Sequence, residues 1–237
     1  MEVVDKLTNG LEHIEAWVFD LDNTLYPRTC DLFAQVDTLI TQYMMNVTGM
    51  EKVAARRLQK DYYRDHGTTL NGLMLHHDVD PDHYLDSVHN IDYSPVQAHP
   101  ELVETIISLP GKKYIFTNAD MGHTEAVLTR LGALELFDGM FDIRAAGLIP
   151  KPEQPAYDKF LKEHSINPKN AAMFDDLEKN LKVPHLLGMS TIQVIADQEF
   201  SHSQVESWEL DQKGNEDHIH HTTDDLVDFL KSLKVNS

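Results

Sequence analysis

Apolar and polar positions change their spacing along this 237-residue chain. Between Asp31 and Val47, apolar residues recur every three or four positions, which predicts an amphipathic helix. Similar patterns predict further helices at about 51–64, 69–77 and 82–89. Because no convincing strand pattern occurs between Pro27 and Pro100, residues 29–97 are predicted to form an all-helical block.

From Lys112 onward, short apolar runs alternate with helical patterns. Strands are predicted at 114–117, 141–145, 171–174 and 191–196, and helices at 124–131, 156–164 and 178–187. After a polar segment at 197–217, interpreted as a long surface loop, a final amphipathic helix is predicted at 223–233. Such alternation is typical of a parallel sheet with helices on both faces. The predicted fold class is therefore α/β, with a Rossmann-like parallel sheet.

One further strand pattern, from Trp17 to Phe19, ends in two acids, Asp20 and Asp22. A buried acid needs a cation or hydrogen-bond donors to tolerate its surroundings. In open parallel sheets, ligands bind just beyond the carboxyl ends of the strands. The pair is therefore a candidate magnesium site that carries a carboxylate nucleophile. The alternative is an acidic turn that opens a helix.

Phosphoryl transfer from a carboxylate also requires a hard divalent cation, donors to the phosphate oxygens and an acid for the leaving group. Three later positions carry further groups of these kinds. Thr117 and Asn118 follow a predicted strand and offer hydroxyl, amide and backbone donors. Lys151 stands between two prolines at a helix entrance, which gives it a defined direction. Asp175 and Asp176 follow another predicted strand. Their order along the chain makes accident a poor explanation.

The four motifs, DLDNT, FTN, PKP and FDD, resemble those of the haloacid dehalogenase-like hydrolase superfamily over about residues 16–196. The resemblance implies that Asp20 is a nucleophile that forms an aspartyl-phosphate. It implies that Asp22 protonates the leaving alkoxide and then activates water. Thr117 and Lys151 would hold the phosphate oxygens. Dehalogenase members lack an acid at the position of Asp22, so its presence favours a phosphatase or phosphotransferase.

The resemblance also implies a Mg²⁺ cofactor. Its ligands would be the carboxylates of Asp20 and Asp176 and the backbone carbonyl of Asp22, with Asp175 beside them or bound through water. The helical block at 29–97 would be an inserted α-helical cap over a catalytic α/β core formed by residues 1–28 and 98–237. Such a lid would exclude water and contact the leaving group.

The string DLDNTLYP and the cap segment from Tyr62 to Leu73 resemble the pyrimidine 5′-nucleotidase branch, whose members dephosphorylate UMP- and CMP-like nucleotides. Arg64 and Asn71 are candidate base or ribose contacts, together with Tyr63, His66, Thr68 and Thr69. The plainer interpretation of these side chains is a helix end and a turn. Two functional alternatives are hydrolysis of a sugar phosphate or phosphoglycolate, and a receiver-like phospho-Asp signalling module. Receiver modules are about half this length and have no cap.

Composition limits the partners. Lys and Arg number 20 against 39 Asp and Glu, a net charge of −19, which argues against nucleic acid and anionic membranes. A small phosphorylated metabolite is the expected partner, and the oligomeric state is left open. The single cysteine, Cys30, excludes an intramolecular disulfide and fits a reducing compartment. With no apolar signal region or membrane-length run, a cytoplasmic location is expected.

Two histidine clusters, at 76–77 and 218–221, resemble fragments of a transition-metal site. Neither has a partner cluster at ligand spacing, so both are predicted to have structural or surface roles.

Overall fold

A computed structural model of the protein describes residues 10–195 and 216–233, which fall into two compact units. The larger unit contains residues 10–29, 96–195 and 216–233. The smaller contains residues 30–95. The smaller unit is inserted into the chain of the larger one, between its first and second strands. No helix in these ranges has the length and apolar character needed to cross a membrane.

The larger unit is built on a six-stranded sheet in the order β3-β2-β1-β4-β5-β6, in which every neighbouring pair is parallel. The strands are β1 (Ala16–Phe19), β2 (Lys112–Phe116), β3 (Gly139–Phe141), β4 (Ala171–Asp175), β5 (Ser190–Val194) and β6 (His221–Thr223). Every residue of β1 and β4 is buried, because both are central strands covered on both faces. The predicted α/β fold class is confirmed.

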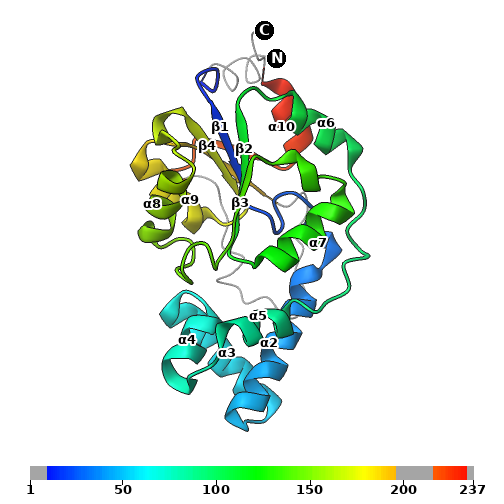
Figure 1. Cartoon of the computed structure of the whole chain (residues 1–237), viewed down its shortest axis with the longest axis vertical. Coiled ribbons are helices and arrows are strands. Elements are labelled where there is room, and N and C mark those ends of the chain that lie inside the picture. The colour runs from blue at the N-terminus through cyan, green and yellow to red at the C-terminus, as the bar shows by residue number, and fades with distance from the viewer. Residues whose placement is uncertain (1–9, 196–215, 234–237) are drawn as a thin grey trace. The chain divides into compact units, whose positions relative to one another are not determined.

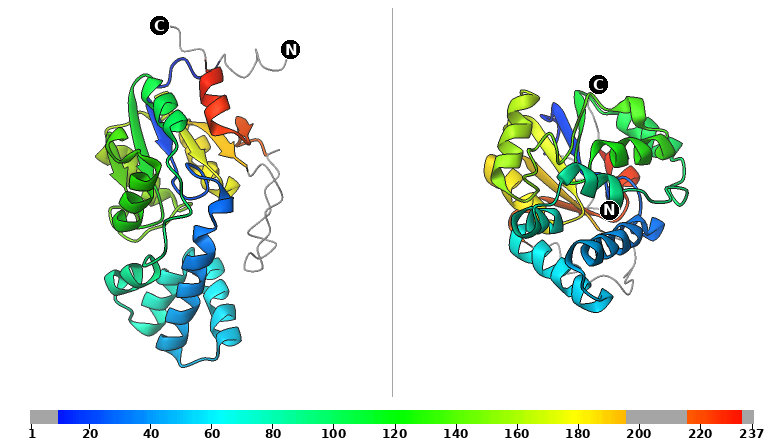
Figure 2. Two further views of the ribbon diagram at one scale, coloured as in Figure 1. Left: turned by 90° about the vertical axis from the view of Figure 1, so that its right-hand side faces the viewer. Right: turned by 60° about the horizontal axis from the view of Figure 1, so that its bottom comes forward.

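Helices cover both faces of this sheet. Figure 1 shows α6 (Pro100–Ser108), α7 (Met121–Leu131) and α10 (Leu226–Ser232) on one side, and α8 (Gln154–Glu163) and α9 (Glu178–Leu187) on the other. In the right-hand view of Figure 2, the yellow helices α8 and α9 again lie on the opposite side of the strands from the green helices α6 and α7. Short 3₁₀ turns lie at η1 (Arg28–Cys30), η2 (Leu134–Leu136) and η3 (Pro168–Asn170).

Aromatic rings fill the core on both sides of the sheet. Alternate residues of a strand point to opposite faces. Phe19 of β1 stacks on Phe174 of β4 with centroids 4.7 Å apart. Phe116 of β2 stacks on Phe160 of α8 at 4.9 Å. Each such ring contributes about 1.5–3 kcal/mol by leaving water. This packing holds the ends of the central strands in a fixed relation.

The smaller unit consists of four helices, α2 (Leu32–Thr48), α3 (Lys52–His66), α4 (Thr69–His77) and α5 (Pro81–Val88). Gly49, in the left-handed region with φ 70°, ends α2. The Asp37 carboxylate is 1% exposed and is satisfied by Arg56, Lys60 and Gln59 of α3. This buried polar group joins α2 to α3.

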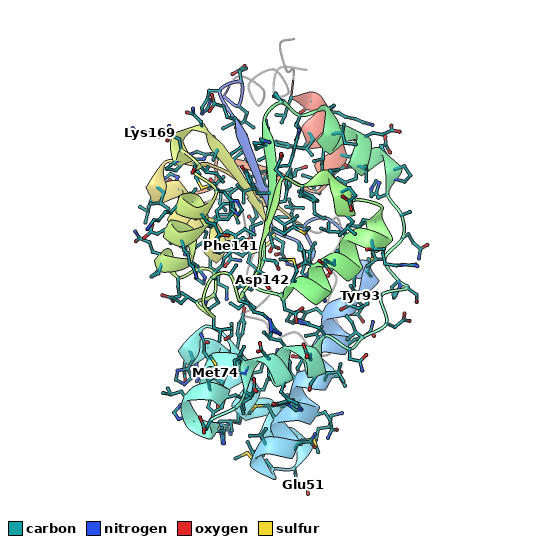
Figure 3. The ribbon with its side chains drawn as sticks, in the orientation of Figure 1. Glu51, Met74, Tyr93, Phe141, Asp142 and Lys169 are labelled. Carbon is teal, nitrogen blue, oxygen red and sulfur yellow. The ribbon has the colours of Figure 1, made fainter. Side chains whose placement is uncertain are left out.

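Three local features differ from the pattern-based predictions. The strand predicted at 141–145 ends at Phe141, because Asp142 Oδ1 accepts a hydrogen bond from the Ala145 N–H at 2.7 Å and turns the chain. Figure 3 labels Phe141 and Asp142 at this point. Helix α6 and strand β6 were not predicted. The predicted loop at 197–217 lies outside the described residues, apart from its last two positions.

Both histidine clusters make structural contacts. His220 Nδ1 accepts a hydrogen bond from the Thr191 N–H of β5 at 3.0 Å, next to β6. In the helical unit, His77 Nε2 lies 2.9 Å from the Tyr62 hydroxyl, and His76 stacks on the Tyr62 ring. These contacts agree with the predicted structural roles.

Candidate active site

The sheet order brings the three strand-end motifs together. Strand β1 lies between β2 and β4, and Phe19 is in register with Ile115 on one side and Phe174 on the other. Asp20, Thr117 and the Asp175–Asp176 pair therefore meet at the same carboxyl edge. This is the edge at which open α/β sheets bind their ligands.

Asp20 is the centre of this cluster and is 7% exposed. Its Oδ1 accepts a hydrogen bond from Lys151 Nζ at 2.7 Å, and its Oδ2 accepts one from the Thr24 hydroxyl at 3.3 Å. Burial raises the pKa of Asp20; the charge of Lys151 opposes this, while the neighbouring carboxylates raise the pKa further. The ionised form that a nucleophile requires therefore depends on cations at this site.

Lys151 is the cation that the structure supplies. Its ammonium is 2% exposed and lies 2.7 Å from Asp20 Oδ1 and 2.6 Å from Asp175 Oδ2. Burial acts to lower the pKa of Lys151, but the two carboxylates outweigh it and raise the pKa above its ordinary value. One buried ammonium thus holds two motifs together, and removal of Lys151 would leave the buried Asp20 and Asp175 carboxylates without their shared cation.

The amide of Asn118 bonds to the backbone of Lys151. Its Oδ1 accepts a hydrogen bond from the Lys151 N–H at 2.8 Å, and its Nδ2 donates to the Lys151 carbonyl at 3.1 Å. One Nδ2 hydrogen is left by these two bonds, and contact of Asn118 with phosphate remains a prediction. Thr117 is buried, and its Oγ1 accepts a hydrogen bond from the Ala119 N–H at 3.0 Å. The Thr117 O–H can still donate to a phosphate oxygen.

A candidate cation site is formed by Asp20, Asp175 and Asp176, whose carboxylate oxygens lie within 4.8 Å of one another. Among residues 10–195 and 216–233 this is the one such group of three acidic, histidine or cysteine ligands. All three are buried, and their charges exceed by one those of the two basic partners, Lys151 and Arg28. A hard cation bound by oxygen would balance this excess.

The two acids of the fourth motif, Asp175 and Asp176, differ in how they are bonded. Asp175 Oδ2 accepts from Lys151, and its Oδ1 accepts from Asn180 Nδ2 at 2.9 Å and from the Leu177 N–H at 3.0 Å. Asp176 Oδ2 accepts from Arg28 at 2.8 Å. Burial and the charge of Asp175 raise the pKa of Asp176 to about 7, against the opposing charge of Arg28. The carboxylate oxygens of Asp175 therefore accept more hydrogen bonds from the protein than those of Asp176. This leaves Asp176 the better candidate to bind a cation directly.

Asp22 is surrounded by residues that the sequence patterns did not identify. Its Oδ1 lies 2.7 Å from His123 Nε2 of α7 and accepts a short hydrogen bond from the Tyr26 hydroxyl. Burial acts to lower the pKa of His123, but the charge of Asp22 and the hydrogen bond to it raise the pKa overall. Arg28, beside Asp176, was also missed. No motif spacing identifies His123 or Arg28, because each contacts a partner that only the folded chain provides. Tyr26 lies within DLDNTLYP, but no role was predicted for it.

The candidate substrate residues of the helical unit lie on α3 and α4. Arg64 has 59% of its side chain exposed and pairs with Asp61 at 2.9 Å and Asp65 at 2.8 Å. Asn71 Nδ2 donates to the His66 carbonyl at 3.1 Å, across the turn between the two helices. Contact of either residue with substrate remains a prediction.

Comparison with known proteins gives one curated relative of note. The chain is 25% identical over 213 residues to "Phosphate metabolism protein 8" of Saccharomyces cerevisiae. The match covers 81% of this chain and 65% of the yeast protein, so the chain spans less than two thirds of that relative's length.

Solved structures match over nearly the whole chain. The L-2-haloacid dehalogenase of Xanthobacter autotrophicus with chloropropionic acid covalently bound has a TM-score of 0.59 and 15% identity, over 94% of this chain and 100% of that one. A HAD phosphatase of Thermococcus onnurineus has a TM-score of 0.59 and 16% identity, over 93% and 98%. These similarities concern the fold. A family model described as haloacid dehalogenase-like hydrolase matches residues 14–183, well over half of the chain. The chain belongs to the haloacid dehalogenase-like hydrolase family.

Proposed function

We propose that this hydrolase is a magnesium-dependent phosphomonoesterase that acts through an aspartyl-phosphate on Asp20. The observation that carries the proposal is the difference between the two acids of the first motif. Asp20 is buried against the Lys151 ammonium, whereas Asp22 has 29% of its side chain exposed and is held by its own donors. These different surroundings suit Asp20 to attack on phosphorus and Asp22 to proton transfer.

The residues would divide the reaction as follows. Asp20 attacks phosphorus while Asp22 gives a proton to the departing oxygen, and water then attacks the aspartyl-phosphate after giving a proton to Asp22. Lys151 and the Thr117 hydroxyl hold phosphate oxygens. Asp20, Asp176 and the Asp22 backbone carbonyl would hold Mg²⁺, which when bound offsets the charge of the phosphate and the acids. The all-oxygen ligand set of this cluster suits that cation.

The proposed substrates are pyrimidine nucleoside 5′-monophosphates such as UMP and CMP. Support comes from the likeness of DLDNTLYP and the cap segment to the pyrimidine 5′-nucleotidase branch, with Arg64 and Asn71 as candidate contacts. The name of the yeast relative associates that protein with phosphate metabolism. We also expect a cytoplasmic location, in agreement with the single cysteine, Cys30.

Two alternatives predict different results in one experiment. Phosphate release would be measured from UMP, CMP, purine nucleotides, sugar phosphates and phosphoglycolate, with and without Mg²⁺, with Asp20→Asn as the inactive control. The proposal expects Mg²⁺-dependent release that is fastest with the pyrimidine nucleotides. Faster release from a sugar phosphate or phosphoglycolate would replace the substrate assignment. A phosphorylated Asp20 that persists for minutes without turnover would favour a receiver-like signalling module.

A further inference from the structure

His123 and Tyr26 place two hydrogen-bond donors on one oxygen of Asp22. His123 Nε2 lies 2.7 Å from Asp22 Oδ1, and the Tyr26 hydroxyl donates to the same atom. The His123 side chain is 2% exposed and Tyr26 is 4% exposed, whereas the Asp22 side chain is 29% exposed. The partly exposed carboxylate of Asp22 therefore accepts hydrogen bonds from two buried side chains.

Such an arrangement fixes the orientation of the carboxyl group. A free aspartate side chain rotates among staggered rotamers, whereas two donors on Oδ1 select one of them. Oδ1 can accept hydrogen bonds when Asp22 is ionised and, more weakly, when it is protonated on its other oxygen. Both donors therefore stay on Oδ1 whether Asp22 is ionised or protonated, and the proton that Asp22 transfers is carried by Oδ2. His123 takes the tautomer with hydrogen on Nε2, since Oδ1 accepts.

The position of His123 is itself set by the connection that carries the phosphate-binding residues. Helix α7 begins after Asp120, whose Oδ1 accepts a hydrogen bond from the His123 N–H at 2.9 Å. The Thr124 hydroxyl donates to the Asp120 carbonyl at 2.8 Å, which secures the same turn. Because this segment directly follows Thr117, Thr117 and the donor to Asp22 lie close together along the chain, between the end of β2 and the first turn of α7.

We propose that His123 is a positioning residue for Asp22, and that together with Tyr26 it directs Oδ2 toward the leaving oxygen. The inference rests on the proposed function and specifies how its acid is oriented. In the first step the proton moves from Asp22 Oδ2 to the leaving oxygen as its bond to phosphorus breaks and the Asp20–phosphorus bond forms. In the second, water gives a proton to Oδ2 as its oxygen bonds to phosphorus and the Asp20–phosphorus bond breaks. His123 gives up no proton in either step.

The test compares substrates whose leaving groups differ in their need for an acid. A ribose 5′-oxygen needs protonation, whereas p-nitrophenolate departs without it. His123→Leu fills similar space without a donor, and His123→Gln restores an N–H near the position of Nε2. The first step would be followed by rapid quench with UMP and by the p-nitrophenol burst with p-nitrophenyl phosphate. His164→Leu, a histidine outside this site, is the matched control.

His123→Leu should slow the first step with UMP by about 10- to 100-fold, and with p-nitrophenyl phosphate by less than about 3-fold. His123→Gln should recover most of the loss. Tyr26→Phe, which removes one hydroxyl, should show a smaller loss with the same preference for UMP. On an Asp22→Asn background, His123→Leu should have no further effect on the first step, because the group that it orients is gone. The control should affect both substrates equally.

Two results would overturn the inference in different ways. If Asp22→Asn is selectively slow with UMP but His123→Leu and Tyr26→Phe slow both substrates equally, the histidine is only structural and the proposed function stands. If Asp22→Asn itself shows no dependence on the leaving group, the proposed acid is wrong, and the inference fails with it. Should His123→Leu not fold, His123→Gln and Tyr26→Phe decide the matter through the same comparison.

Discussion

Asn118 holds Lys151 by both of its backbone polar groups, with the N–H donating to Asn118 Oδ1 at 2.8 Å and the carbonyl accepting from Nδ2 at 3.1 Å. The side chain of that lysine reaches Asp20 and Asp175. The Asn118 amide, at the end of the second motif, therefore fixes the backbone of Lys151 in the third motif and with it the direction of the ammonium.

Replacement of Asn118 by Ala should lower activity more than stability. Two hydrogen bonds are lost, which costs about 0.5–1.5 kcal/mol each. Displacement of the Lys151 ammonium by a fraction of an ångström should lower kcat by about 10- to 100-fold. Steady-state kinetics and thermal unfolding of Asn118→Ala would check this, with Asn170→Ala, a half-buried amide in η3, as the control. Unchanged kcat in Asn118→Ala would show that the lysine needs no such support.

Replacement of Asp20 by Asn should abolish the covalent intermediate with every substrate. The change keeps the shape of the side chain and removes the nucleophilic charge. Acid quench after mixing with ³²P-labelled substrate should show a labelled protein for wild type and none for Asp20→Asn. Wild-type turnover by the variant would move the nucleophile elsewhere, and Asp175 or Asp176 would be tested next.

Removal of divalent cations by EDTA should abolish turnover, and Mg²⁺ should restore it. Calcium should inhibit, because its looser coordination orients the nucleophile less well. Direct calorimetric titration with Mg²⁺ should show binding to wild type and weaker binding, by about tenfold or more, to Asp176→Asn. Full activity after exhaustive chelation would contradict the assigned cation site.

Replacement of Arg64 by Gln should change the order of substrate preference if the helical unit recognises the base. Its ion pairs with Asp61 and Asp65 are exposed, so stability should change little. Relative kcat/KM for UMP, CMP and p-nitrophenyl phosphate is the readout, and Arg57→Gln, on the same helix, is the control. Tyr63 and Asn71 would be tested in the same way. Equal losses with all three substrates would show that these residues do not read the base.

The pH dependence of stability should contain a contribution from His164. Burial lowers the pKa of His164, and its Nε2 is buried with no hydrogen-bond partner within the described part of the chain. Because the unfolded chain binds the proton more tightly, this histidine costs no stability above its unfolded pKa of about 6.5. The cost grows as the pH falls through 6.5 toward the lowered folded value.

His164→Leu removes that titration. The Tm of wild type relative to the variant should therefore decrease between pH 8 and pH 5, as measured by thermal unfolding at intervals of half a pH unit. The acids of the active site titrate in both proteins and cancel in the difference. A constant gap between the two curves would show that His164 binds protons equally well in the folded and unfolded chains.

Local patterns were sufficient to predict the fold class and the acids that gather at one edge of the sheet. A buried strand is recognised by a short apolar run, and polar residues after such runs in a parallel sheet must meet at the same edge. For this reason Asp20, Thr117 and the Asp175–Asp176 pair could be grouped from the sequence. The spacing of apolar residues likewise located α4 and α9 at their observed bounds, 69–77 and 178–187.

Tertiary structure alone decided which atoms pair. Nothing in the local pattern relates His123 to Asp22 or Arg28 to Asp176, because these residues are brought together by the pairing of strands that lie far apart in the chain. The two hydrogen bonds between the Asn118 amide and the Lys151 backbone depend on the same packing. The sequence by itself determines periodicity and the kinds of chemical groups at the strand ends. Hydrogen bonds depend on distances of about 3 Å between side chains, and only the folded chain sets those distances.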